Sequence, residues 1–452
     1  MKETPQIVIR TRKTETPAQS QEFHFSADMI RQTPAAPGLE SLRREAWKVF
    51  SELPMPSLRD EPWRRTDLKG MRAGSFVPPT TNLVNDLRKI PPQLLQPLTA
   101  DAHGGQVILQ PGGARVEVDG EIRQKGVIFT DLVTAEKEYP QLVEKALGKV
   151  VSAREGKFAA LATALSQNGV FLYVPRNVEL DQPLHSLLWG PGKELAYFSH
   201  ILVYLEEGAR VTYVHESASP DEEGQSFHAG VVEIYVGNDA SLRFVELQSW
   251  GEHVWNFSHE RTRVERDGNI DWIFGAIGSH LTKNFSDLEL ASEGSTGRMS
   301  GFYFTDHDQH LDHDTQQNHL APHTTSDLLF KGALLDESRS VWQGMIYVAP
   351  GAQKTDGYQA NRNLVLSKSA RADSIPGLEI LADDVRCTHG ATVGQIDADQ
   401  VFYLMARGIP RASAEKLVVE GFFDQIMQRI PFEGVRERFQ TAIHEKMLRY
   451  NG

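Results

Sequence analysis

The chain has 452 residues, 47 Lys+Arg against 60 Asp+Glu, a formal net charge of −13 and a hydrophobic fraction of 40%, which is the composition of a globular protein with two or three domains. Its single cysteine, Cys387, excludes an intramolecular disulfide and a four-cysteine metal or iron–sulfur site made by this chain alone, and it suggests a reducing compartment. The acidic balance argues against nucleic acid as a partner, and no apolar run reaches the ~18–20 residues of a membrane span, so we expect a soluble cytoplasmic protein.

The first third of the chain is predicted to be a polar arm followed by a helix-rich region. Residues 1–36 are polar and proline-bearing, which indicates a poorly ordered arm. In the N-terminal region, residues 37–168, Leu39, Ala46 and Phe50 recur at helical spacing before Pro54. A second helical stretch around Phe158 ends near residue 168.

The pattern changes in residues 169–397 to short β-rich runs separated by turn signals. Most of these turns recur at about thirty-residue intervals, for example Glu207-Gly208, Asn238-Asp239 and Asp267-Gly268. This loose period favours stacked coils of a β-solenoid, but a β-sandwich also has frequent turns. Periodicity alone leaves the two architectures open.

The last region, residues 398–452, is predicted to be helical again. It holds two apolar stripes at helical spacing, which a chain of this kind can bury only against its own body or against a partner. The stripes consist of Leu417, Val418, Phe422, Ile426 and Ile430, and then Val435, Phe439, Ile443 and Met447.

A histidine- and aspartate-rich run at 306–314 is the most conspicuous candidate site. If residues 308–314 form a strand, Asp308, His310, Asp312 and Asp314 share one face and offer nitrogen and oxygen ligands for zinc or iron. The competing interpretation is a ladder of hydrogen-bonded polar side chains. The run lacks the spacing of a recognised metal motif such as His-Glu-x-x-His.

The second candidate site is Cys387-Thr388-His389. In an extended strand, Val385, Cys387 and His389 point the same way, so that a thiol and an imidazole could bind a soft metal or hold sulfur species. Alternatively, Cys387 is a small buried apolar residue and His389 a hydrogen-bonded neighbour. The sequence has no phosphate-binding loop, so any nucleotide energy would have to come from a partner.

Several ordered blocks together resemble one known family. They are Glu-Pro-Trp-Arg-Arg-Thr-Asp at 61–67, His-Leu-Ala-Pro-His-Thr-Thr-Ser at 319–326, Lys-Thr-Asp-Gly-Tyr-Gln-Ala-Asn-Arg at 354–362, Ile-Pro-Gly-Leu-Glu-Ile at 375–380 and Val-Arg-Cys-Thr-His-Gly at 385–390. This set looks like the SufB/SufD family, the scaffold proteins of Suf iron–sulfur cluster assembly. The Cys-Thr-His-Gly block and the lack of further cysteines resemble the SufD branch rather than SufB. Arg65 departs from the aromatic residue that is usual there.

The resemblance implies a fold and a set of partners. The expected fold is mainly β, a right-handed parallel β-helix flanked by helical N- and C-terminal regions. The expected function is that of a non-catalytic scaffold in a complex with a SufB-like paralogue and a SufC-like ATPase. The ATPase is expected to dock on the C-terminal helices, for which the docking residues are predicted to be Leu417, Phe422, Phe423 and Ile426.

The resemblance also implies a site, a cargo and a cofactor. A nascent iron–sulfur cluster would be built transiently at the interface with SufB, with His389 as a metal ligand shared with the partner chain and Cys387 beside it. Some complexes of the family are associated with reduced flavin, for which the sequence locates no site. A homodimer stays open, because two copies would offer similar solenoid edges.

Two rival hypotheses come from other classes of protein. One is a metal-dependent β-helix enzyme that uses His307, His310 and His313. The other is a solenoid that mediates assembly without contacting a cluster. The first predicts a stoichiometric metal and a loss of function in His310→Ala. The second predicts that Cys387→Ala and His389→Ala are silent, whereas truncation after Arg411 abolishes complex formation.

Overall fold

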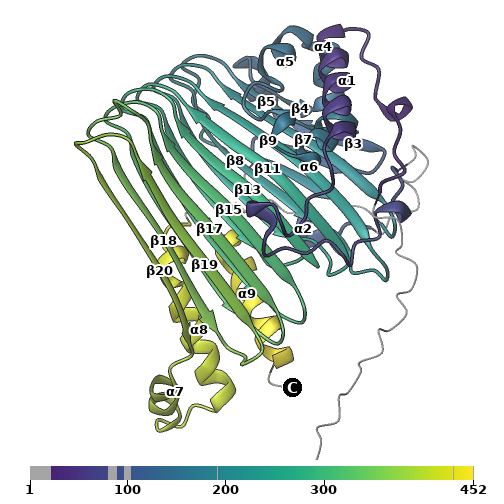
Figure 1. The fold of residues 1–452 in the computed structure, drawn as a ribbon. Coiled ribbons are helices and arrows are strands. Elements are labelled where there is room, and N and C mark those ends of the chain that lie inside the picture. Colours follow the sequence, from purple (N-terminus) through teal and green to yellow (C-terminus); the bar gives the residue numbers. More distant parts are fainter. Residues whose placement is uncertain (1–21, 80–88, 96–102, 191, 431, 451–452) are drawn as a thin grey trace, which may run out of the picture.

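The structure is a computed structural model that describes residues 22–79, 89–95, 103–190, 192–430 and 432–450. Its main feature is a parallel β-solenoid of about 8 turns, with helical regions at both ends of the chain (Figure 1). From β5 (Asn168–Val174) on, successive strands alternate between two sheets, and strands two places apart along the chain pair in parallel. The predicted solenoid is therefore confirmed, and the β-sandwich alternative is wrong.

Within the described residues, the two sheets have ten and nine strands. The ten-stranded sheet runs in the order β20 (Arg386–Gln395), β18 (Asp356–Val365), β16 (Thr325–Leu334), β14 (Thr296–Thr305), β12 (Asn269–Ala276), β10 (Ser241–Ser249), β8 (Arg210–Ala218), β6 (Leu184–Trp189), β2 (Gly105–Gln110) and β3 (Gly113–Val118). The nine-stranded sheet runs in the order β19 (Arg371–Ile380), β17 (Arg339–Val348), β15 (His310–His319), β13 (Leu281–Leu290), β11 (Val254–Val264), β9 (Ser226–Val236), β7 (Ala196–Leu205), β5 (Asn168–Val174) and β4 (Ile128–Asp131).

One corner of the solenoid repeats the same backbone conformation from coil to coil. A residue with positive φ occupies this corner, and its amide donates to a carbonyl of the next coil; for example, Gly208 N donates to Asn238 O at 2.8 Å and Asp239 N to Arg266 O at 2.9 Å. Glycine, asparagine and aspartate tolerate this conformation best, which is why the sequence marks most corners with them. The stacked residues are Asn177, Gly208, Asp239, Asp267, Gly294, His323 and Lys354.

Side chains that point inward from both sheets fill the solenoid in register. Tyr213, Phe244 and Trp272 lie directly above one another on β8, β10 and β12, and all three are buried. Alternate residues of the same strands point outward, so each sheet also has an outer face that needs a cover. The helical regions provide that cover.

The N-terminal region covers the outer face of the nine-stranded sheet near the start of the solenoid. Helices α1 (Pro37–Glu52) and α6 (Lys157–Leu165), both expected from the sequence, bury apolar side chains there together with strand residues such as Phe227 and Phe257. Shorter elements complete the region: η1 (Ala27–Met29), η2 (Glu61–Trp63), η3 (Ala73–Ser75), α2 (Pro92–Leu95), α3 (Gly120–Gln124), α4 (Leu132–Glu138), α5 (Pro140–Ala146) and η5 (Ala153–Glu155).

The predicted polar arm, residues 1–36, is only partly described. Residues 1–21 lie outside the described residues. From residue 22 on, the chain packs on the body: the ring centroid of Phe23 lies 5.0 Å from that of Phe227, and the ring centroid of Phe25 lies 5.3 Å from that of Phe198. The two aromatic rings give this stretch an apolar anchor that the polar composition of the arm conceals.

The C-terminal helices cover the outer face of the ten-stranded sheet. Helices α8 (Arg411–Met427) and α9 (Glu433–Tyr450) pack on it, and α7 (Ala398–Met405) projects beyond the strand ends (Figure 1). The Phe439 ring centroid on α9 lies 4.0 Å from that of Phe302 on β14. Among the described residues, no helix is long and apolar enough to cross a membrane.

The two ends of the solenoid differ. At the first end, β3 and β4 each pair antiparallel with the outermost parallel strand of their sheet, and helix α4 packs on this end. At the last end, no further strand of the described chain lies beside β19 or β20, and no residue of either strand is buried. The last coil is therefore an uncovered surface.

Candidate functional site

Cys387 and His389 lie in this uncovered coil and continue rows of inward-pointing residues. On β20, Cys387 lies in register with Gly357 of β18, and His389 lies in register with Gln359. The predicted common direction of Val385 and Cys387 fits the structure, since both pack against the same small apolar cluster, which includes Ile346. His389 is exposed because no further coil lies above it.

The thiol of Cys387 is half-buried, and Gly357, which has no side chain, leaves space for it. A Cβ atom on Gly357 would lie 3.2 Å from the Cys387 Sγ, so a larger residue there would press on the sulfur. Burial raises the pKa of the Cys387 thiol, an effect that the Gly357 amide opposes by hydrogen bonding and that nearby Asp356 reinforces. At neutral pH the group is therefore mainly a thiol, and a bound metal or a new cationic neighbour would be needed to make it a thiolate.

Beneath this coil the interior of the solenoid changes from aromatic to polar side chains. Gln359 and Asn361 of β18 are fully buried, and Asn361 Nδ2 contacts Tyr303 Oη at 3.3 Å. The Oε1 atoms of Gln359 and Gln317 have no hydrogen-bond partner among the described residues. The sequence analysis did not identify these amides, although their alternation Gln359, Asn361, Asn363 on one strand face was a signal that could have found them.

His319, which follows the histidine-rich run, makes hydrogen bonds at the corner between β15 and β16. Its Nδ1 contacts Thr324 Oγ1 at 2.7 Å and its Nε2 contacts Ser326 Oγ at 2.8 Å. Burial lowers the pKa of His319 to about 4, so the ring is neutral. Because hydroxyl groups contact both ring nitrogens of His319, we assign the block at 319–326 a structural role in this corner.

The structure does not bring His307, His310 and His313 together. His310 points to the outer face, where its Nε2 lies 3.0 Å from Thr66 Oγ1. His313 points into the solenoid between the rings of Phe274 and Tyr303. His307 lies in the turn before β15 with positive φ. Strand alternation sends neighbouring residues to opposite faces, so the metal-dependent enzyme built on these three histidines loses its geometric basis.

The outward half of the run instead anchors the N-terminal segment. Of the predicted face, Asp308 is in the exposed turn, whereas the buried Asp312 accepts hydrogen bonds from Thr66 and from Lys283 Nζ, the latter at 2.9 Å. Trp63 packs beside them, its ring centroid 6.0 Å from that of Phe285. The blocks at 61–67 and 306–314 thus meet as a structural contact, the hydrogen-bonded ladder that was the competing interpretation.

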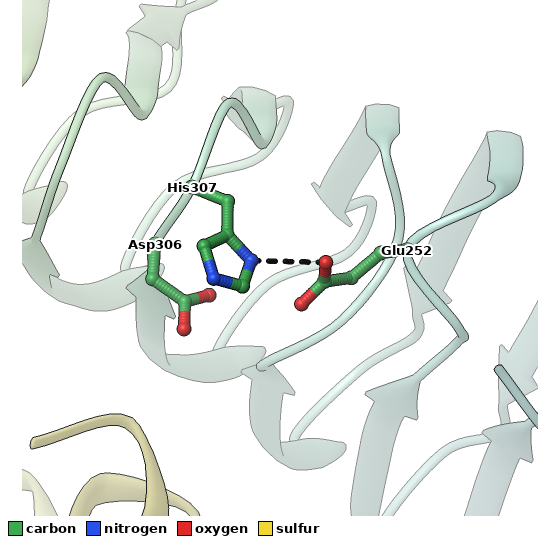
Figure 2. Close-up of side chains that lie close together, drawn as sticks. All are labelled: Glu252, Asp306 and His307. Carbon is green, nitrogen blue, oxygen red and sulfur yellow. Dashed lines mark hydrogen bonds and ion pairs between the residues drawn. The ribbon is translucent and has the colours of Figure 1, made fainter. Parts of the chain in front are cut away.

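One group of described residues has the spacing of a metal site: Glu252, Asp306 and His307, whose ligand atoms lie within 4.8 Å of one another (Figure 2). His307 Nδ1 lies 3.0 Å from Glu252 Oε2. Both carboxylates, however, already have cationic partners from α9. Lys446 Nζ pairs with Asp306, and Arg449 lies 3.1 Å from Asp306 Oδ2 and 3.6 Å from Glu252 Oε1. We therefore assign this group as an ionic contact that holds the end of α9.

The predicted docking residues of the C-terminal helices divide into two sets. Phe423 and Ile426 are fully buried against the ten-stranded sheet, because α8 turns this side of its stripe toward the solenoid, so they are not free to contact a partner. Phe422 is partly buried, and its carbonyl accepts from Lys331 Nζ at 2.7 Å. Leu417 is 45% exposed. On α7, Phe402, Tyr403 and Met405 are 69%, 55% and 41% exposed and were missed by the sequence analysis.

Comparison with known proteins gives one consistent result. A family model described as the SUF system FeS cluster assembly, SufBD core domain, matches residues 188–422, and one described as the SufBD protein N-terminal region matches residues 117–185. A Staphylococcus haemolyticus (strain JCSC1435) protein named as an iron–sulfur cluster assembly SufBD family protein is 30% identical over 405 residues, which covers 86% of this chain and 85% of the relative. A Staphylococcus aureus (strain USA300) protein of the same family name is 33% identical over 319 residues, 70% of this chain and 68% of the relative.

Proposed function

The chain belongs to the SufBD family of iron–sulfur cluster assembly proteins, and from this premise we propose that it is a non-catalytic, cytoplasmic scaffold subunit of the SufD type. In this proposal its last coil joins a SufB-like paralogue, and the nascent cluster is the cargo of that interface. The observation that carries the proposal is the position of Cys387 and His389 on a coil that nothing covers.

The open end has the properties of an edge that another solenoid can extend. β19 and β20 each expose one edge of unpaired backbone groups, which a strand of a partner can satisfy. Leu378 and Ile380 on β19 lie in register with the inward-pointing Ile346 and Val348 on β17 and are the last residues of these two rows. They are 37% and 38% exposed. Apolar residues of this kind gain from being covered, at roughly 25 cal/mol for each Å² removed from water.

The chemistry of the site fits a ligand set shared between two chains. The imidazole of His389 offers a nitrogen ligand to iron, and the Cys387 sulfur lies one inward position away. The chain has no second cysteine, so a cluster would need thiolates and sulfide from the partner side. Covering the site would also remove water from it, which strengthens metal–ligand and ionic contacts.

The docking surface for a SufC-like ATPase is proposed to be the exposed apolar face of α7 and the start of α8. It consists of Phe402, Tyr403, Met405 and Leu417. These residues lie on helices that follow the last strand directly, so force applied to α7 would reach the cluster interface through a short connection. A second copy of this chain is the alternative occupant of the open end, and it would form a homodimer.

The test is cluster assembly by the complex that forms when the full chain is co-expressed with its SufB-like and SufC-like relatives. His389→Ala should lower the yield of assembled cluster at least tenfold, with the complex intact by gel filtration, because a ligand is lost and no structural contact is. His24→Ala is the matched control, since His24 is also exposed but lies near the N-terminal region. Unchanged yield in both His389→Ala and Cys387→Ala would favour the assembly-only solenoid instead.

A further inference from the structure

A small polar chamber lies inside the solenoid, several coils away from the open end. It has a volume of about 30 Å³, and its walls come from inward-pointing residues of β7 to β13. Two carboxylic acids line it, Glu246 from β10 and Glu260 from β11, and both are buried. The space is large enough for about two water molecules, or for one ion with one water.

The chamber exists because one row of the stack has small side chains. Ser199, Gly230 and Ser258 lie in register on β7, β9 and β11. A Cβ atom on Gly230 would lie 2.9 Å from His228 Cε1 and 3.2 Å from Ser199 Oγ, so the glycine leaves room that any other residue would occupy. On the opposite sheet, Phe274 of β12 lies in register with Glu246 of β10 and forms part of the chamber wall.

The two acids differ in their hydrogen bonds. Glu260 accepts hydrogen bonds from Asn284 Nδ2 at 2.6 Å and from Ser286 Oγ at 3.2 Å, and both bonds favour its charged form. Glu246 Oε2 has no hydrogen-bond partner among the described residues, although the side chain is 8% exposed and lines the chamber. Burial raises the pKa of both carboxyl groups, and the proximity of Glu260 raises that of Glu246 further.

Among the described residues, no cationic side chain lines the chamber to balance a negative charge on either acid. No lysine or arginine lines the chamber. Its two histidines are neutral, since burial lowers the pKa of His215 to about 3 and that of His228 to about 4. Their nitrogens are engaged by protein groups: His228 contacts Ser199 and Asn256, while His215 contacts Ser186 and Ser217. A buried, uncompensated carboxylate is costly unless a metal ion or a further proton joins it.

We propose that this chamber is a binding site for one hard divalent cation, held by the carboxylates of Glu246 and Glu260 together with the hydroxyl of Ser258. Oxygen ligands of this kind suit ions such as Mn²⁺, Mg²⁺ or Ca²⁺ rather than soft metals. A 2+ ion bound to the two carboxylates gives a neutral site, and any proton that either acid holds beforehand is released to solvent. The site is separate from Cys387 and His389, because the inward rings of Phe330 and Trp342 lie between them.

The experiment titrates the full chain with Mn²⁺ and measures free Mn²⁺ by electron paramagnetic resonance. The wild-type chain should bind one Mn²⁺ at pH 8, and the affinity should fall as the pH is lowered, because protons compete with the ion for the two carboxylates. Glu246→Gln should lower the affinity at least tenfold and should fold normally, because the amide has the shape of the protonated acid. Glu260→Gln should have the same effect on Mn²⁺ binding.

The matched control is Glu252→Gln in the surface group of Figure 2, which should leave Mn²⁺ binding unchanged. Two outcomes would overturn the proposal. One is binding that Glu252→Gln abolishes and Glu246→Gln retains, since this places the ion at the surface group. The other is the absence of saturable binding at pH 8, since the chamber then holds only water.

Discussion

The buried imidazole of His313 shows that some polar residues inside this solenoid lower the stability of the folded protein. His313 is 1% exposed, and neither of its ring nitrogens has a hydrogen-bond partner among the described residues. Its ring is surrounded by those of Phe274, Tyr303 and Phe330. Burial lowers the pKa of His313 to about 3, well below the value near 6.5 that the unfolded chain would show. The folded protein therefore resists taking up a proton that the unfolded chain accepts.

We predict that His313→Phe raises stability more in acid than at neutral pH. The folded pKa is depressed, so the wild-type chain keeps this part of its stability above pH 6.5 and loses it as the pH falls toward 3, at about 1.4 kcal/mol per unit. Between pH 7 and pH 5 the advantage of the variant should grow by about 2 kcal/mol, as measured by urea unfolding. An advantage that does not change with pH would show that His313 is protonated, or solvated, in the folded state.

The fate of the histidine-rich run also shows what could not be predicted at this scale. Alternation along a strand correctly separates the face of His310 and Asp312 from that of His313. Strand alternation cannot predict which residues cover the outer face, since Thr66 lies 244 positions from His310 in the chain. By contrast, Cys387 and His389 belong to one strand, and alternation alone was enough to place them on the same side.

At the scale of elements, helix α9 is held by cations that reach acids of the solenoid. Lys446 is 5% exposed and pairs with the buried Asp306 while also donating to Gln309 Oε1 at 2.9 Å. Arg438 reaches the buried Glu216 farther back along the helix. Arg449, in the last turn, makes its contacts from an exposed position. These ion pairs fix the register of the helix on the ten-stranded sheet.

Lys446→Met should release the end of α9, because it leaves the Asp306 carboxylate buried without its strongest partner. Breaking a buried pair in this way costs about 3 kcal/mol, whereas an exposed pair contributes less than about 1 kcal/mol. Arg449→Ala is accordingly the control and should have a small effect. The measurement is hydrogen exchange of the α9 amides, and equal exchange in the two variants would mean that apolar packing alone holds the helix.

The apolar stripes of α8 and α9 illustrate the limit of prediction for elements. Helical spacing correctly identified both stripes, and residues such as Phe423 and Phe439 are indeed buried. The spacing could not say whether the partner of the stripe was another protein or the chain itself. The ten-stranded sheet turned out to expose a matching apolar face through residues such as Phe302 and Leu329, so part of the predicted docking surface is internal.

At the scale of the whole molecule, the two ends of the solenoid have opposite properties. The first end is closed by the antiparallel strands β3 and β4, whose pairing stops the parallel register. The last end is open along both sheets. A solenoid with one open end can join a single partner through that end, and the product then has closed strands at both extremities. The fold thus favours a pair of solenoids over a fibre.

Val393→Lys should block this pairing without affecting the isolated chain. Val393 is 50% exposed on β20, so a lysine there should change the stability of the isolated chain by no more than about 0.5 kcal/mol, while its charge would be buried by a docked partner. Light scattering of the co-expressed complex should show loss of the two-solenoid species. Leu58→Lys, at a site that is 48% exposed in the N-terminal region, should leave it intact. Assembly unaffected by Val393→Lys would place the interface elsewhere.

The solenoid could be predicted from the sequence because each of its corners requires a residue with positive φ. Pairs such as Glu207-Gly208 and Asn238-Asp239 mark positions of positive φ that the structure stacks one above the other. The corners occupied by His323 and Lys354 have the same positive φ and the same hydrogen bond to the next coil, but neither residue is a typical turn residue, so the sequence does not mark them. Because these two corners are not marked by a turn residue, the thirty-residue period is only approximate in the sequence.

The open end has a consequence for the order in which the molecule melts. In a stack of repeats, each coil is stabilised chiefly by the coils on either side of it. The coil formed by β19 and β20 has such a neighbour on one side only, whereas the coils before it have two. Fraying should therefore begin there, in the coil that carries Cys387 and His389. A docked partner would supply the missing neighbour, so that assembly and the ordering of these two side chains become one event.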